Sequence, residues 1–274
     1  MTTATTTFPP IERPTATRAL QAAAAAWFVV TALGQSLFVL YILAFYGRAV
    51  LLGQPESINK VLPRGYVPGD TPGNVMLGLH LFLAAVIIGG GLLQLVPQLR
   101  TMAPRLHRWN GRVYASLAVV ASLAGLLMMV TRGAVGGPLM HAGMALDALL
   151  VVAFALMAVR TARARRFDSH RRWALRLFMA VSAVWFFRVG LMAWLLLNGG
   201  PVGFDPVSFR GPFLDVLAFA QYLLPLAVLE LYLRAQASRN ALACNAMTGV
   251  LALATLVTAA GILGAAMGMW LPRL

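Results

Sequence analysis

The chain has 274 residues, of which 60% are hydrophobic and 11% are charged, and its mean hydropathy is +0.78. A soluble protein carries about 25% charged residues, so this composition excludes a water-soluble domain and indicates that much apolar surface faces lipid. The net charge of +14 does not indicate a nucleic-acid partner, because the sequence lacks a basic reading helix or a basic sheet with aromatic residues. The single cysteine, Cys244, excludes an intrachain disulfide and a cysteine-based metal centre.

The predicted elements are seven membrane-spanning helices, which makes the fold class an all-α integral membrane bundle. A bilayer core requires about 20 apolar residues in a helix. In chain order the seven stretches of this length cover residues 20–46, 75–97, 108–130, 139–159, 173–197, 213–233 and 242–271. Residues 1–19 are expected to form a disordered cytoplasmic tail, and residues 20–274 a single transmembrane domain. Spans two to five, residues 75–197, are expected to form its four-helix core.

The distribution of basic residues predicts the orientation of the chain. Of the 22 Lys and Arg residues, fifteen lie at one set of span ends, six lie at the other, and Arg188 lies inside a span. Because short cytoplasmic loops collect positive charge, the N-terminus is expected in the cytoplasm and the C-terminus outside. We therefore expect a multi-pass protein of a bacterial cytoplasmic membrane, with the lipid bilayer as its partner.

The four histidines lie at or near the N-terminal starts of four consecutive spans. His80 and His141 belong to spans two and four and are expected near the outer face. His107 and His170 belong to spans three and five and are expected near the cytoplasmic face. Because successive spans are antiparallel, this arrangement predicts one two-imidazole site on each face, which a bis-histidine haem or a metal ion could use.

The residues around these histidines form a pattern that covers spans two to five. It consists of His80, Gln94, Arg100, HRWNGRVY from residue 107, His141, HRRWALR from residue 170, and Arg188. This pattern resembles an uncharacterised family of bacterial multi-spanning membrane proteins, catalogued only as a domain of unknown function. The resemblance implies the membrane fold and supplies no activity.

A second resemblance is architectural. One histidine on each of four consecutive helices is similar to the two-haem transmembrane cytochromes b, including the ascorbate-reducible group. This resemblance implies that His80 and His141 ligate an outer haem b and that His107 and His170 ligate an inner one. The arginines near the inner pair would then neutralise haem propionates, because guanidinium groups suit bidentate contacts with carboxylates. These arginines are Arg100, Arg108, Arg112, Arg171 and Arg176.

Other interpretations of the histidines remain open. The HRW and HRRW motifs would also anchor helix ends at headgroup depth, where arginine binds lipid phosphates. His80 and His141 would also serve as helix-packing hydrogen-bond partners. A copper(I) site is a further alternative, because thioethers lie on the faces of these two histidines. The methionines concerned are Met76, Met140 and Met144.

Three further polar residues lie within the predicted spans. Asp147 and Arg188 are expected at similar depths in spans four and five, where they would form an ion pair or a proton- or quinone-handling site. Gln94 in span two is expected to bond a neighbouring helix. The leading hypothesis is a haem-binding protein that transfers electrons across the membrane from a quinol or a small reductant. The alternative is a haem-free transporter or accessory protein that binds a small ligand, proton, metal ion or lipid at the histidines.

Overall fold

The computed structural model describes residues 15–62, 65–238 and 240–274, and these residues form helices joined by short connections. The α-helices are α1 (Thr15–Tyr41), α2 (Gly47–Leu51), α3 (Thr71–Leu95), α4 (Pro97–Met102), α5 (Pro104–Arg132), α6 (Pro138–Arg163), α7 (Phe167–Val181), α8 (Ala183–Asn198), α9 (Pro212–Ala237) and α10 (Ala241–Ala265). The π-helical turn η1 (Ile42–Tyr46) joins α1 to α2, and a second, η3 (Ala266–Trp270), continues α10. A 3-10 turn, η2 (Pro55–Lys60), follows α2, and another, η4 (Leu271–Arg273), follows η3. Most of the expected tail, residues 1–14, lies outside the described residues, but residues 15–19 already belong to α1.

The prediction of seven spans is confirmed. Within the described part of the chain, six helical segments are long and apolar enough to cross a membrane. The seventh span is the pair α7 and α8, which passes the same test but bends by 52° at Ser182. Large apolar side chains on the outer faces of the helices are exposed, as expected for surfaces that contact lipid.

Prolines set many of the helix starts. Four helices, α4, α5, α6 and α9, have proline as their first residue. Proline suits this position because its missing N–H would have no partner in the first turn and its φ angle is already helical. At the start of α3 the carboxylate of Asp70 caps the helix, and it accepts a hydrogen bond of 3.0 Å from the Gly73 N–H.

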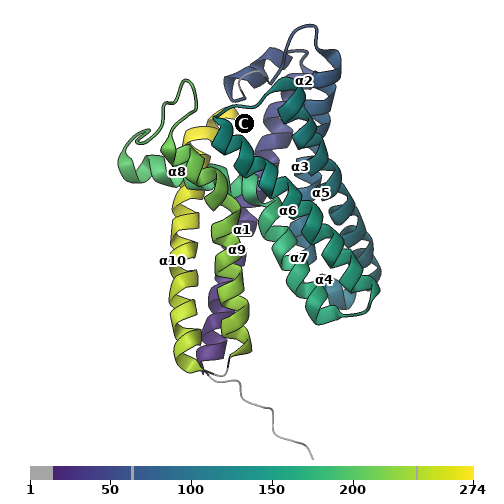
Figure 1. The fold of residues 1–274 in the computed structure, drawn as a ribbon, viewed down its shortest axis with the longest axis vertical. Helices are drawn as coiled ribbons and strands as arrows, with labels where there is room; N and C mark the ends of the chain where they lie inside the picture. Colours follow the sequence, from purple (N-terminus) through teal and green to yellow (C-terminus); the bar gives the residue numbers. More distant parts are fainter. Residues whose placement is uncertain (1–14, 63–64, 239) are drawn as a thin grey trace, which may run out of the picture.

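The helices form two groups, which diverge toward the lower end of the molecule (Figure 1). Helices α3, α5, α6 and α7 pack around a shared apolar core that includes Ile87, Tyr114, Val151 and Leu177, and we call this group the four-helix core. Helices α1, α9 and α10 form the second group. The α6–α7 connection, which contains Arg165 and Arg166, and the α9–α10 connection lie at the lower end in Figure 1. We call this the arginine-rich end.

The bend after α7 corrects one expectation. Residues 183–197 were expected to belong to the four-helix core, but α8, which contains them, packs against α9 and α10. The contact with α10 is very close, because a Cβ added at Gly261 would collide with the backbone oxygen of Val189. The bend itself is held by a buried hydrogen bond of 3.0 Å from the Gln35 side chain of α1 to the Ser182 hydroxyl.

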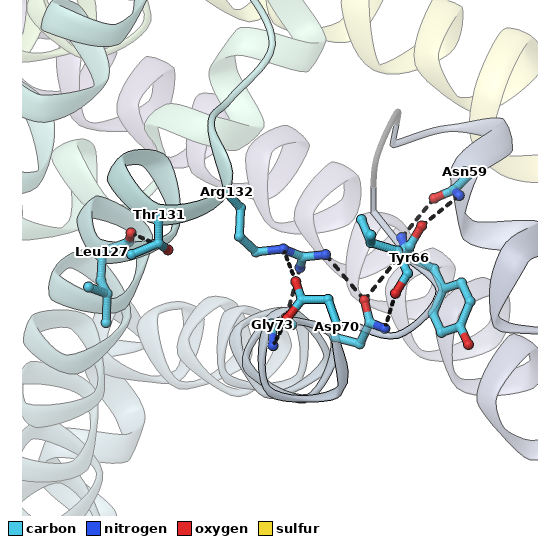
Figure 2. Close-up of polar contacts among 9 residues, drawn as sticks. Asn59, Tyr66, Asp70, Gly73, Leu127, Thr131 and Arg132 are labelled. Atoms are coloured by element: carbon cyan, nitrogen blue, oxygen red, sulfur yellow. Dashed lines mark hydrogen bonds and ion pairs between the residues drawn. The ribbon is translucent and has the colours of Figure 1, made fainter.

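At the opposite end, a network of polar contacts fixes the start of α3 to the end of α5 (Figure 2). The Arg132 guanidinium lies 3.0 Å from the Asp70 carboxylate and donates a 2.8 Å hydrogen bond to the Gly73 carbonyl. The side chain of Asn59 pairs with both backbone polar groups of Tyr66, as Figure 2 also shows. The Asp70 carboxylate therefore both caps α3 and joins it to α5.

Candidate functional site

His107 and His170 lie at the arginine-rich end, near the starts of α5 and α7. The His170 Nδ1 lies 2.9 Å from the Ala158 carbonyl of α6. Because a carbonyl oxygen can only accept, the hydrogen of the neutral imidazole is on Nδ1 and the lone pair is on Nε2. A backbone carbonyl that holds one ring nitrogen in this way is the usual support for a metal-ligating histidine.

The His107 imidazole lies close enough to His170 to feel the charge of that histidine. The positive charges of Arg100 and Arg108 also reach the His107 imidazole. Its Nδ1 is buried and has no hydrogen-bond partner among the described residues. The structure therefore brings the inner pair of histidines into one region, with two of the predicted arginines beside it.

Gln94 has a positioning role in this region. Its amide donates a 2.9 Å hydrogen bond to the backbone carbonyl of His107, so the end of α3 holds the start of α5 in place. A second bond joins the same two helices one turn further along α5. There the Asn110 amide donates a 2.8 Å hydrogen bond to the Gly90 carbonyl of α3. The sequence analysis missed Asn110, although it stands within the HRWNGR motif.

The remaining predicted arginines point elsewhere. Arg176 makes two hydrogen bonds to Glu230 of α9, at 2.6 and 3.0 Å, and lies over the Trp173 ring. Arg171 donates a 3.0 Å hydrogen bond to Gln236, also on α9. Arg112 stacks on Trp109 of its own helix. Arg171 and Arg176 thus join the four-helix core to α9. The sequence analysis missed Glu230, whose signal was an acidic residue inside a predicted span.

The contacts of His80 and His141, the predicted outer pair, are with different parts of the chain. The His141 Nε2–H donates to the carbonyls of Ala134 and Val135, at 3.1 and 3.3 Å, and so closes the connection before α6. His80 lies deeper, beside Gly125 of α5, where an added Cβ would be 3.5 Å from its Cε1 atom. No hydrogen bond or charge interaction joins His80 to His141 in the described residues.

Two of the methionines near the outer histidines, Met140 and Met144, have a packing role. Met140 is buried in an apolar cluster with Leu214 and Leu217 of α9, and Met144 packs against the same cluster. The described residues contain no group of three or more His, Cys, Asp or Glu side chains that could hold a metal ion. These contacts favour packing over the copper alternative.

The expected Asp147–Arg188 ion pair is wrong. Arg188 lies over the Phe38 ring of α1, at 5.1 Å, and donates a 3.0 Å hydrogen bond to the Val184 carbonyl of its own helix. The carboxylate charge of Asp147 instead acts on the hydroxyl of Tyr222 in α9. One carboxylate oxygen of Asp147 and the Tyr222 hydroxyl are buried without hydrogen-bond partners among the described residues. The bend at Ser182 explains the error, because it turns α8 toward α1 and α10.

These features define a multi-span helical membrane protein with a histidine pair at one end of its four-helix core. Residues 77–224, a little more than half of the chain, match the family described as "Predicted membrane protein (DUF2306)". The chain belongs to this family. No curated protein and no solved structure matches the chain. The family description agrees with the membrane fold and states no activity.

Proposed function

We propose that the protein is a membrane-embedded, b-type cytochrome-like protein that binds one haem between His107 and His170. In this proposal it belongs to a bacterial cytoplasmic membrane and exchanges electrons with a quinol or another small reductant. The observation that carries the proposal is the hydrogen bond from His170 Nδ1 to the Ala158 carbonyl, at 2.9 Å, beside the unpartnered His107 imidazole.

The donor chemistry of the two histidines fits this group. The bond to Ala158 leaves the Nε2 lone pair of His170 available, and it fixes the direction of the ring. His107 keeps a buried Nδ1 atom without a partner. A haem held by two such imidazoles would supply one-electron oxidation and reduction.

The surrounding residues position the pair and set its charge. Gln94 and Asn110 hold the start of α5 against α3, and these bonds fix the position of His107 relative to α3. Arg100 and Arg108 place positive charge on the same side as His107. Guanidinium groups there favour bound carboxylates such as propionates. The geometry supports one haem at the inner pair better than the two haems that the resemblance implies, because His141 is committed to its own loop.

Absorption spectra of the purified protein test the proposal. Protein from haem-supplemented cells is expected to show a Soret band, reduced-state α and β bands with dithionite, and a pyridine haemochrome. The variants His107→Ala and His170→Ala should lose these bands, whereas His80→Ala and His141→Ala should keep them. Circular dichroism and size-exclusion profiles confirm that each variant is folded. A colourless wild-type protein overturns the proposal, and bands that depend on His80 or His141 overturn the assignment of the site.

The pair Asp147 and Tyr222 favours a second candidate, a haem-free transporter or accessory protein. Polar groups within lipid are costly and tend to have a function, and both of these side chains have a buried oxygen without a partner among the described residues. In this case a folded, colourless protein is expected to exchange protons in liposomes that contain a pH-sensitive dye. Asp147→Asn should slow this exchange, and Asp215→Asn, at the outer end of α9, serves as the control.

A further inference from the structure

A cavity of about 230 Å³ lies at the end of the molecule opposite to the histidine pair. Its polar wall contains Arg48, Gln54, Ser57 and Arg273, and Phe45 contributes to its apolar wall. These residues come from three parts of the chain, namely the η1–α2 segment, the turn at residues 54–60, and the η4 turn after η3. The cavity is therefore a product of the fold, and the sequence analysis did not identify it.

Both arginines of this cavity lack an acidic partner among the described residues. The described residues contain two ion pairs, Arg132 with Asp70 and Arg176 with Glu230, and neither involves a cavity arginine. Arg48 is exposed, and its side chain makes no hydrogen bond to any of the described residues. Arg273 donates only to backbone carbonyls of the preceding turn, the closer being that of Met269 at 2.7 Å.

Glu56, the acidic residue closest in sequence to Arg48, does not neutralise the positive charge of the cavity. Glu56 is exposed in η2, does not line the cavity, and forms no ion pair within the described ranges. The cavity therefore combines two positive charges with no negative one. A guanidinium group presents several donors in a fixed plane, and this geometry matches a phosphate or carboxylate oxyanion.

A buried hydroxyl group continues the polar region inward. Tyr41 is 1% exposed, and its hydroxyl has no hydrogen-bond partner among the described residues. The charges of Arg273 and Arg188 both act on this hydroxyl. Arg188, inside a predicted span, lies over Phe38 and has no carboxylate partner among the described residues. The Tyr41 hydroxyl thus lies within reach of the charge of one cavity arginine, Arg273, and of Arg188.

The size and lining of the cavity define the class of ligand. A volume of about 230 Å³ is smaller than the roughly 300–1,000 Å³ of sites that enclose a drug-sized molecule. It accommodates one oxyanion group but not a lipid tail. Leu52 lines the cavity and is exposed, as is its chain neighbour Leu51, so they suit an apolar body that remains in the membrane.

We propose that Arg48 and Arg273 form an anion-binding site for a phosphate group, carried by a lipid headgroup or present as free phosphate. The site is independent of the histidine pair, since it lies at the other end of the molecule and uses other residues. Gln54 assists with a side-chain amide that has no partner in the described part of the chain.

Lipid retention tests the site. Wild-type protein in nanodiscs of phosphatidylglycerol and phosphatidylcholine is expected to retain phosphatidylglycerol preferentially when analysed by native mass spectrometry. Because each variant removes charge-assisted hydrogen bonds to the phosphate, Arg48→Gln and Arg273→Gln should each weaken retention about tenfold. Lys60→Gln removes the same charge from the same end of the molecule, outside the cavity, and should have no effect. Arg48→Lys should retain most of the binding.

A second measurement distinguishes the two sources of phosphate. Inorganic phosphate added to the protein in neutral detergent should raise the melting temperature of the wild type but not that of the Arg48→Gln variant. Stabilisation without lipid preference identifies free phosphate, and lipid preference without stabilisation identifies a headgroup. Equal retention of both lipids together with no stabilisation overturns the proposal. An effect of Lys60→Gln equal to that of Arg48→Gln also overturns it.

Discussion

The ion pair between Arg176 and Glu230 is expected to stabilise the contact between the two helix groups. It joins α7 to α9 through two hydrogen bonds of 2.6 and 3.0 Å, and the side chains are 19% and 37% exposed. Arg176 also lies over Trp173, with 4.5 Å between the guanidinium carbon and the ring centre. Replacement by Met keeps the apolar stem of Arg176 but leaves the Glu230 carboxylate without its partner.

The cost of Arg176→Met lies between two known limits. An exposed ion pair contributes about 0–1 kcal/mol, whereas removal of one partner from a fully buried pair costs about 3–5 kcal/mol. Glu230 is more than one third exposed, so screening reduces the upper value. We expect a loss of about 1–2 kcal/mol in the free energy of unfolding.

A double-mutant cycle measures this interaction. Unfolding of Arg176→Met, Glu230→Met and the double variant is followed by circular dichroism in mixed micelles with increasing dodecyl sulfate. Because the double variant leaves no unpaired charge, it should cost less than the sum of the two single variants by about 1 kcal/mol. Additive losses, or a single-variant loss below about 0.5 kcal/mol, would show that the pair does not hold the two groups together.

Two further predictions concern stability and use the same assay. Asp70→Ala removes both the cap of α3 and the ion pair with Arg132, and it should cost about 1–2 kcal/mol; Asp70→Asn, which retains a capping oxygen, should cost less, and equal losses would contradict the role of the charge. Gly261→Val places side-chain atoms against the Val189 backbone and should cost about 1–3 kcal/mol. Gly249→Val, on the same helix with no atom within 4 Å of an added Cβ, is the matched control, and a similar loss there would refute the close-packing argument.

The spans could be predicted from the sequence because hydropathy reports directly on contact with lipid. The predicted span at residues 139–159 corresponds to α6, Pro138–Arg163, and its start differs by one residue. Its end differs by four residues because α6 continues through Arg160 and Arg163. Basic side chains are favourable in the last turn of a helix, so the helix extends beyond the apolar stretch.

The bend at Ser182 could not be predicted, because its causes are distant in the sequence. Gln35 and Ser182, which form the buried hydrogen bond at the bend, are separated by 147 residues. The close contact between Gly261 and Val189 is also non-local. By hydropathy, residues 173–197 form one continuous apolar stretch. Only the packing against α1 and α10 divides this stretch between α7 and α8.

The histidines show a similar division between what spacing reveals and what contacts decide. Their positions at helix starts were visible in the sequence, and so was the expectation that His107 and His170 lie at the same end of the molecule. Which ring nitrogen keeps a free lone pair depends on carbonyls that only the fold brings near. For His170 the carbonyl belongs to Ala158 of α6, and for His141 the carbonyls belong to Ala134 and Val135.

The bend also explains how one predicted span serves two regions of the molecule. Helix α7 stays in the four-helix core and carries His170 at the arginine-rich end, whereas α8 leaves the core and carries Arg188 to Phe38 of α1. A straight helix would keep Arg188 in the four-helix core, where Asp147 was its expected partner. Because the bend separates them, Asp147 is left beside Tyr222, and Arg188 is left to act on Tyr41 below the proposed anion site. The structure thus separates the acidic and basic groups that the sequence analysis had paired, and each becomes available for a different ligand.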